Sequence, residues 1–473
     1  MQEFIKNLKC EYSEKISALI KKKCSFAISG ITNCAKLVIL SRLLIKYSQK
    51  IVFITETEQN ALKFQNDIKN LTGKQAVVVP YQDGSIYDTN SKNLYKYAKQ
   101  TEILNNSENY EIIIVPQKAL FEKFPDKDFF EENNITIKIN DEIDVDKLAL
   151  EFVKLGYKRK TLVADIGEFS IRGDIIDIFP LSSLPYRIEL WGDTVTDIRV
   201  FNNSNQKSVK KVTSAIIQPV YKFILNDDSY KKVENLIDDE DENQTELLEN
   251  IRSKNYFEGI EYYESYFNGD LTVLSRLISK NFIFVFDDYT QFKSRYENTD
   301  ENLEQQYEEN IKTKLSLPLQ AKNHLNLKDF LITVSSYTKI YFDNLLSDEF
   351  DINIEFNTEL IPYFASGLEE IAEFILKKLK ERYIIIAATD YKQRIEEILK
   401  EYEIPFSYKF EDKNAVYITD NIVYGGSIIE DCKLIIITDK EFFNKRSKYI
   451  TGARYNYKRE NADFIETLND IKE

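Results

Sequence analysis

The sequence predicts an α/β multidomain protein: a parallel α/β domain with an inserted antiparallel β-rich domain, followed by a second, small α/β domain. Three observations predict this architecture. Strand and helix patterns alternate in the first part of the chain and again near its end, as they do when helices cover both faces of a parallel sheet. Between these parts lies a run of short, alternating strands with glycine turns, which is typical of an antiparallel meander. The length of 473 residues is enough for about three domains.

Composition and charge are those of a globular chain, with 43% hydrophobic and 30% charged residues. The net charge of −15 predicts that the chain as a whole is repelled by nucleic acid and by anionic membranes. Any contact with DNA would therefore need a local basic patch. No apolar run approaches the roughly 18 residues that a membrane span requires, and charged residues in the first twenty argue against a secretory signal. We expect no membrane partner.

The four cysteines are scattered and show no paired spacing; they are Cys10, Cys24, Cys34 and Cys432. This pattern predicts reduced thiols in a reducing compartment, and hence a cytoplasmic protein. His324 is the only histidine, which argues against histidine metal sites and against Ser-His-Asp catalysis.

The first part of the chain is expected to open with an amphipathic helix over residues 1–23. A βαβ pattern follows, with strands at 25–29, 50–54, 75–79 and 111–115 and helices at 33–47 and 57–71. Beyond the meander, further strands are expected at 215–219, 281–286, 330–335 and 339–342, with a long helix at 289–314. The acidic stretch 226–250 is interpreted as a solvated helix–loop surface, with a docking surface for a basic partner as the alternative.

The first turn of this pattern has the spacing of a phosphate-binding loop, GxxxxGK[ST], beginning at Gly30. The second glycine is replaced by Ala35, and the residue that should hold Mg²⁺ is Leu37, which cannot ligate a hard cation. Strand 111–115 runs into Val-Pro-Gln, where a nucleotide hydrolase would place an acidic pair. We therefore expect a degenerate loop that binds no nucleotide, with Lys36 exposed at the start of a helix.

The meander begins at GEFSIRGDIIDIFP, residues 167–180, and continues in PYRIELWGD, residues 185–193. A basic island accompanies its first strand and the helix expected at 145–155. It contains Lys154, Lys158, Arg159, Lys160 and Arg172 against Asp165 and Glu168. Charge alone favours an ordinary solvated strand face, and a docking surface is the alternative.

The last part alternates again, with strands expected at 383–388, 415–419 and 433–438 and helices at 367–382, 391–402 and 440–444. Asp390, Asp420 and Asp439 follow strands, where an α/β site would lie, but we expect them to cap helices. The basic and aromatic stretch after Phe443 is interpreted as a connector, with nucleic-acid binding as the alternative.

The amino-acid sequence of the meander resembles that of a known family. Gly156-Tyr157, GEFSIRGDIIDIFP and PYRIELWGDTVTDIRVFNNSNQKS are closely similar to the second domain of transcription-repair coupling factors (Mfd), and the excision-repair protein UvrB carries a related version. The resemblance is closest over 150–210 and extends over 25–455. It implies the N-terminal UvrB-like region, domains 1 to 3. The implied units are a split, degenerate helicase-type α/β domain (1–124 and 209–345), an inserted UvrA-docking domain (125–208), an acidic linker (346–356), a small α/β domain (357–450) and a connector (451–473).

The resemblance also implies a function, which is to recruit the nucleotide-excision repair ATPase UvrA to stalled RNA polymerase. The region would be non-catalytic in itself and autoinhibitory in the full-length protein. The partner contacts that it implies are Arg159, Arg172, Phe169 and Lys158, although Phe169 fits the core equally well. It implies no cofactor or metal in this chain, with ATP and Mg²⁺ bound by motor domains beyond it, and a monomer whose full-length form binds RNA polymerase and double-stranded DNA.

Two other functions remain open from the sequence. A UvrB-like DNA damage-binding helicase would need an intact phosphate-binding loop and an acidic metal motif, which GITNCAKL and the strand at 111–115 do not supply. A general acidic scaffold would show no dependence on Arg159 or Arg172.

Overall fold

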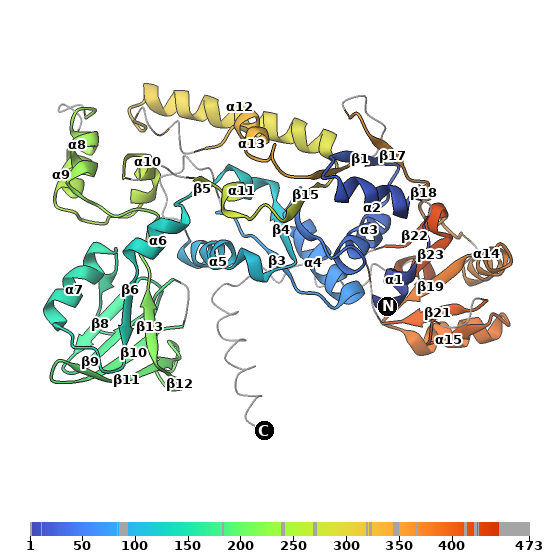
Figure 1. Ribbon diagram of the computed structural model, residues 1–473, viewed down its shortest axis with the longest axis horizontal. Coiled ribbons are helices and arrows are strands. Elements are labelled where there is room, and N and C mark those ends of the chain that lie inside the picture. Colours follow the sequence, from blue (N-terminus) through green and yellow to red (C-terminus); the bar gives the residue numbers. More distant parts are fainter. Residues whose placement is uncertain are drawn as a thin grey trace.

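The computed structural model describes residues 2–10, 12–82, 84, 93–181, 184–237, 242–267, 272–317, 320, 324–343, 350–365, 367–410, 414–420, 423 and 425–443. The expected connector at 451–473 lies outside the described residues. Three large sheets follow one another along the long axis of the molecule, with the antiparallel sheet at one end and the C-terminal sheet at the other (Figure 1). The mixed α/β class that the sequence predicts is confirmed. Within the described parts, every helix is too short or too polar to cross a lipid bilayer.

The central sheet has seven parallel strands in the order β17-β1-β16-β15-β2-β4-β3. Its members come from two distant parts of the chain, and most of their side chains are buried on both faces, as in a sheet covered on both sides. The strands are β1 (Phe26–Ser29), β2 (Lys50–Thr55), β3 (Ala76–Val78), β4 (Ile112–Pro116), β15 (Phe282–Phe286), β16 (Lys339–Phe342) and β17 (Asn353–Glu355).

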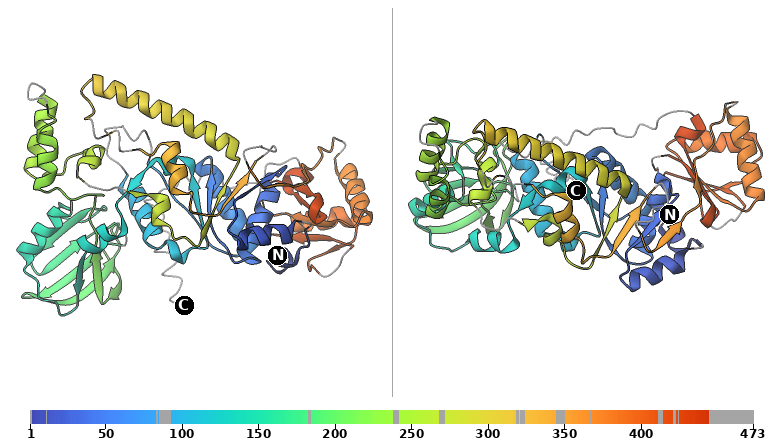
Figure 2. Two further views of the ribbon diagram at one scale, coloured as in Figure 1. Left: turned by 45° about the horizontal axis from the view of Figure 1, so that its top comes forward. Right: turned by 90° about the horizontal axis from the view of Figure 1, so that it is seen from above.

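Helices on both sides complete this core, and α12 runs along its outside (Figure 2). The helix α4 shows why the segments begin and end where they do, because the Thr57 hydroxyl accepts from the Asn60 amide and Gly73 ends the helix at φ +66°. The helices are α3 (Asn33–Ile45), α4 (Glu58–Thr72), α5 (Leu94–Asn105), α11 (Leu274–Leu277), α12 (Tyr289–Lys312) and α13 (Leu327–Thr333).

Two expectations for this part are wrong. The strand expected at 330–335 is the helix α13, whose first turn is capped by the Asn326 side chain accepting from the Asp329 amide. A short apolar run cannot distinguish a strand from a buried helix, and the cap residue was the missed signal. The helix expected over 1–23 is two helices, α1 (Gln2–Asn7) and α2 (Ser13–Lys21). Buried Arg42 donates to the carbonyl oxygens of Ile5 and Leu8 and so satisfies the end of α1.

The second large sheet has the order β12-β11-β10-β9-β8-β7 and is antiparallel except for β7, which runs parallel to β8. The expected meander forms its centre. The helix α7 (Val145–Lys154) packs on this sheet, because the rings of Phe152 and Phe169 lie 5.3 Å apart. The strands are β7 (Lys158–Arg159), β8 (Glu168–Arg172), β9 (Ile175–Ile178), β10 (Tyr186–Trp191), β11 (Thr194–Phe201) and β12 (Ser208–Val212).

Pairing in this region continues past the boundary expected at residue 208. The strand β12 belongs to the six-stranded sheet, and β13 (Ser214–Ile217) pairs with β6 (Ile135–Lys138). Smaller elements connect this region to the central sheet. They are β5 (Lys123–Phe124), α6 (Lys127–Asn133), α8 (Asp227–Glu234), α9 (Glu242–Arg252), α10 (Glu264–Phe267) and β14 (Thr272–Val273).

The third large sheet has the order β18-β22-β23-β19-β21-β20. The strands β23, β19, β21 and β20 are parallel, whereas β22 runs antiparallel to both β23 and β18. The linker expected at 346–356 includes β17, which is an edge strand of the central sheet, so its last residues are part of that sheet. The elements are β18 (Thr358–Glu359), α14 (Leu368–Lys380), β19 (Ile384–Ala388), α15 (Lys392–Glu401), β20 (Phe406–Ser407), β21 (Val416–Thr419), β22 (Ser427–Ile429), β23 (Leu434–Thr438) and α16 (Asp439–Phe443).

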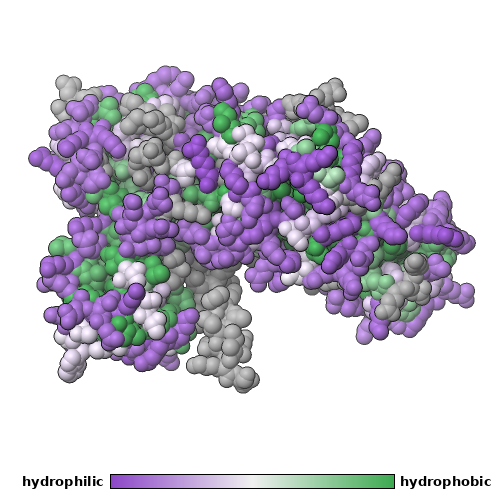
Figure 3. All heavy atoms as spheres, in the orientation of Figure 1, coloured by the Kyte–Doolittle hydropathy of each residue, from purple (hydrophilic) through white to green (hydrophobic). Residues whose placement is uncertain are grey.

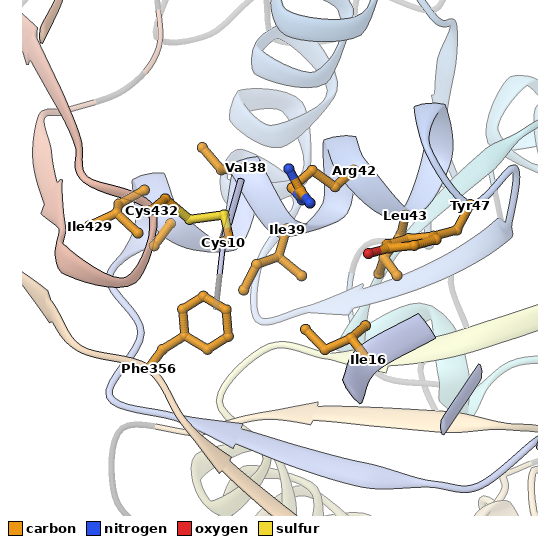
Figure 4. Close-up of a pocket in the computed structure, with 11 residues that line it drawn as sticks. Cys10, Ile16, Val38, Ile39, Arg42, Leu43, Tyr47, Phe356, Ile429 and Cys432 are labelled. Atoms are coloured by element: carbon orange, nitrogen blue, oxygen red, sulfur yellow. A yellow bond between two sulfur atoms is a disulfide. The ribbon is translucent and has the colours of Figure 1, made fainter. Parts of the chain in front are cut away.

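A disulfide joins the N-terminal segment to this third sheet region. Cys10, between α1 and α2, is bonded to Cys432 (Figure 4). Cys24 and Cys34 are free thiols. The expectation that all four cysteines are reduced is therefore wrong, and it no longer supports a reducing compartment. A separation of 422 residues gave no sequence signal for this pair. The cavity beside the disulfide has a volume of about 20 Å³ and apolar walls, so it has no room for more than about one water molecule.

Candidate functional site

The six-stranded sheet has two unlike faces, because side chains alternate along each strand. The inner face is apolar and packs against α7; it carries Phe169, Ile176, Ile188 and Ile198, which have no exposed surface. The opposite, outer face carries Ser170, Arg172, Ile175, Asp177, Arg187, Glu189, Trp191, Asp197, Arg199 and Lys211, as the strand register requires. This outer face is the candidate docking surface.

A buried carboxylate organises the arginines at the centre of the outer face. Asp177 has no exposed surface and accepts from Arg172 Nη2 at 2.6 Å and from Arg187 Nε and Nη2 at 2.8 and 2.9 Å. The Arg187 guanidinium also lies 4.7 Å from the centre of the Phe201 ring. Two parallel bonds fix the plane of a guanidinium, so Arg187 is held rigidly. The Arg172 side chain remains 46% exposed.

The ion pairs continue across the next strands. Arg199 pairs with Glu189 at 2.7 Å and with Asp197 at 2.5 Å, and Lys211 pairs with Asp197 at 3.1 Å. The hydrogen bond from Arg199, assisted by Lys211, holds the pKa of Asp197 below its ordinary value. Asp197 therefore stays ionised near neutral pH and keeps Arg199 and Lys211 in fixed positions.

A loop covers one end of the outer face. The Ser170 hydroxyl donates to the carbonyl oxygen of Thr161 at 3.1 Å, and Val163 and Ile166 pack with Phe179 and Phe201 in a small separate core. The opposite end is open. We call it the open end of the outer face; it comprises Arg172, Ile175, Glu189, Trp191 and Arg199.

The four residues predicted from the sequence as partner contacts lie in three different places in the structure. Lys158 and Arg159 are exposed on β7, the edge strand beside β8, and Arg172 lies at the open end of the outer face. Phe169 has no exposed surface and packs against Phe152, which excludes it as an exposed anchor and supports the core alternative.

Sequence reasoning missed most residues of the outer face, including Arg187, Glu189, Trp191 and Arg199, and also the buried Asp177. The first three occupy alternate positions in PYRIELW, and this period-2 pattern was the signal that could have placed them together.

The loop that begins at Gly30 packs against residues from the C-terminal part of the chain. Gly30 has φ +68°, and a Cβ at this position would lie 2.3 Å from the carbonyl oxygen of Phe356. The Thr32 amide donates to Thr358 Oγ1 at 2.9 Å, and that hydroxyl donates to the Gly30 carbonyl at 2.6 Å. Thr32 Oγ1 also bonds to Ser427 Oγ at 2.6 Å. A loop that binds phosphate needs its amides free, and here the Thr358 side chain occupies the Thr32 amide.

Lys36 is not exposed, contrary to our expectation. Only 5% of the residue is accessible, and its Nζ lies 2.7 Å from Asp287 Oδ1, while the Thr55 hydroxyl donates to the other Asp287 oxygen at 3.2 Å. Ala35 and Leu37 are buried in the core, and burial raises the pKa of the Cys34 thiol far above its ordinary value. The Asp287 carboxylate therefore balances the charge of the Lys36 ammonium, and burial keeps the Cys34 thiol protonated.

The aspartates that follow strands in the third sheet make internal contacts. Asp439 is buried and accepts from the Thr389 hydroxyl and, at 3.1 Å, from the Asp390 amide, while Asp420 pairs with Lys392 at 2.9 Å. These bonds join strand ends to one another and to α15, which differs from the helix caps that we expected. Among the described residues, no three potential metal-ligating side chains form a cluster.

The comparisons with known proteins bear on the same region. Residues 135–223, which include β7 to β12, match the family model described as the UvrB interaction domain. Over 453 residues, 89% of this chain, the sequence is 24% identical to the transcription-repair-coupling factor of Staphylococcus epidermidis. It is 23% identical over 454 residues to that of Staphylococcus aureus.

The resemblance to the coupling factors is therefore confirmed. The chain spans 38% of the length of these relatives, consistent with their N-terminal region. The outer face lies entirely within the part that matches the UvrB interaction domain.

Proposed function

We propose that this chain is the N-terminal UvrB-homology module of a transcription-repair coupling factor, and that it recruits UvrA to stalled RNA polymerase. The observation that carries the proposal is the outer face of the UvrB interaction domain, where a buried aspartate holds two arginines in place. We include in the docking surface the open end of this face together with Lys158 and Arg159 of the edge strand β7, which pairs with Glu168 and Phe169 at the other end of β8.

The physical argument rests on preorganisation. A long arginine side chain loses rotational freedom when it is bound, and this loss weakens an interface. Arg187 and Arg172 have already lost part of that freedom to Asp177, so binding costs them less. Arginines are also frequent energetic centres of interfaces. The chain carries a net charge of −15, so a local concentration of arginine and lysine would steer an acidic partner surface to this end of the molecule.

The same proposal assigns no catalysis to this chain. A UvrB-like damage-binding helicase, the alternative function, needs a free lysine and free loop amides for the nucleotide phosphates. Here Lys36 is paired with the largely buried Asp287, and the Gly30 loop is bonded to Thr358. These contacts favour the recruitment function over the helicase function.

The remaining functions that we propose belong to a full-length coupling factor. In it, motor domains would bind ATP and Mg²⁺, and RNA polymerase and double-stranded DNA would be its further partners. The docking surface would be masked by the motor until a stalled polymerase is engaged, which makes the module autoinhibitory. We propose that the module itself is a cytoplasmic monomer.

Calorimetric titration of the whole chain with purified UvrA tests the proposal. We expect binding that Arg172→Ala and Arg159→Ala each weaken about tenfold to thirtyfold, equivalent to roughly 1.4 to 2 kcal/mol. Arg172→Ala should fold normally, because Arg187 still makes two bonds to Asp177. The matched control is Arg394→Ala, an exposed arginine on α15 that pairs only with Glu397 among the contacts described and should leave the affinity unchanged.

Absence of binding by the wild-type chain at micromolar concentrations would refute recruitment by this module. Binding that neither arginine substitution weakens would retain the function but move the docking surface elsewhere.

A further inference from the structure

The open end of the outer face carries an apolar side chain as well as arginines. Trp191 is the only tryptophan of the chain, and at 82% it is the most exposed large hydrophobic side chain among the described residues. Exposure of an indole to this extent is unusual, because aromatic side chains bury large apolar areas when they have a partner. Nothing in the described part of the chain explains Trp191 as a packing residue.

We propose that Trp191 is the apolar anchor of the docking surface, inserting into an apolar recess with an acidic rim on the UvrA-type partner. This inference rests on the proposed function and deepens it, because it names the residue that adds apolar contact to the contribution of the arginines.

The position of Trp191 in the sheet supports this role. Arg187, Glu189 and Trp191 occupy alternate positions of β10 and so lie on the same face, while Leu190 between them is buried on the other. Glu189 is paired in register with Ile175 of β9, the residue opposite Arg172. The indole therefore extends a surface that already holds two arginines and a half-buried isoleucine. Tryptophan and arginine together are the usual composition of an interface centre.

Backbone hydrogen bonds to a neighbouring segment hold the hairpin that carries Trp191 in place. Trp191 pairs with Thr194 across the turn at Gly192, which has φ +60°. The carbonyl of Asp193 accepts from the Ile143 amide at 2.7 Å, and the Val195 amide donates to the Asp141 carbonyl at 2.9 Å. A ring with two rotatable bonds on a fixed hairpin loses little entropy on binding.

The charges around Trp191 indicate what kind of recess it fits. The open end presents Arg172 and Arg199, and Arg199 already has Glu189 and Asp197 as partners. Arg172 and Arg187 share the single negative charge of Asp177. One positive charge is therefore not balanced there, and the open end can still bind acidic groups around the apolar contact.

A second exposed apolar side chain provides a matched control. Figure 3 shows hydrophobic side chains among hydrophilic ones over this end of the molecule, and Leu150 of α7 is 63% exposed. Because α7 packs on the inner face of the sheet through Phe152, Leu150 belongs to the side opposite Trp191. A general effect of losing surface hydrophobicity would appear in Leu150→Ala as well.

The test uses the whole chain and purified UvrA. We expect Trp191→Ala to weaken binding at least about tenfold, Trp191→Phe to retain most of the affinity, and Leu150→Ala to match the wild type. Because Trp191 is largely exposed, its loss should leave the fold and the melting temperature unchanged. In wild-type chain labelled with fluorotryptophan, the single fluorine NMR resonance should shift or broaden when UvrA is added.

The outcomes separate this inference from the proposed function. Trp191→Ala binding as tightly as the wild type would overturn the anchor and leave recruitment intact, and so would an unmoved fluorine resonance at concentrations where calorimetry detects binding. No binding by the wild-type chain would overturn both.

Discussion

Replacing Lys36 by alanine tests whether this lysine of the GxxxxGK-like loop has a structural role. The side chains of Lys36 and Asp287 are only 6% and 12% exposed, and their charged atoms lie 2.7 Å apart. At an effective dielectric constant of about 20, charges at this distance attract by about 6 kcal/mol before the cost of desolvation is subtracted. Lys36→Ala would leave the Asp287 carboxylate nearly buried, with the Thr55 hydroxyl among its few remaining partners.

Breaking a buried pair in this way lowers the free energy of unfolding by about 3 kcal/mol or more. The matched control is Lys392→Ala, which removes a lysine from an exposed pair with Asp420, where the side chains are 38% and 71% exposed. This control should cost less than about 1 kcal/mol. The double variant Lys36→Met, Asp287→Leu should recover much of the loss, because an apolar pair leaves no unpaired buried charge.

Because the chain contains several sheets, the stability of the central sheet is measured by itself. Hydrogen exchange of the β2 and β15 amides, measured by mass spectrometry, reports the stability of the central sheet directly. We expect Lys36→Ala to accelerate exchange there and to leave β8 to β11 unchanged. Equal protection in the Lys36→Ala and Lys392→Ala variants would refute the structural role of the buried pair.

Three further predictions concern other parts of the molecule. Burial lowers the pKa of His324 despite its bond to Asp300. The imidazole therefore binds a proton more readily in the unfolded chain, and the free energy of unfolding should fall as the pH drops below about 6.5. The NMR signal of the single imidazole gives the pKa, and a value above the ordinary one would contradict this prediction. Without reductant, Cys10→Ser should lower the free energy of unfolding by about 2 to 4 kcal/mol and so lower the melting temperature; with reductant, the variant and the wild type should melt alike. Equal melting temperatures without reductant would argue against the disulfide. Gly30→Ala should increase proteolysis between the central and third sheets, because the added methyl lies 2.3 Å from a backbone oxygen; unchanged digestion would disprove this clash.

Local patterns predicted most of the strands and helices. The strand at 339–342 is found with the expected bounds, and the expected strand at 50–54 is one residue longer in the structure. Such runs of β-branched and aromatic residues fit a pleated, buried surface, so their own sequence is informative. At 330–335 the same reasoning failed, because four apolar residues suit a buried helix equally well.

The contacts that decide function were less predictable, because they join distant parts of the chain. Lys36 pairs with Asp287, and Cys10 is bonded to Cys432. The partners are so far apart in the sequence that no local pattern predicts either contact. The basic character of 158–172 was visible, but which arginine a buried aspartate would hold depended on the register of β8, β9 and β10. Phe169 and Trp191 show the same difficulty, since only the direction of each side chain separates a core residue from an exposed one.

Competition with UvrB for UvrA tests the central claim most directly. If this chain presents the same type of docking surface as UvrB, increasing amounts of it should displace labelled UvrB from UvrA until none remains bound. The Arg172→Ala variant should require at least about tenfold more protein to do so. A stable complex that contains UvrA, UvrB and this chain together at saturation would contradict the claim, because the two proteins would then occupy different surfaces of UvrA.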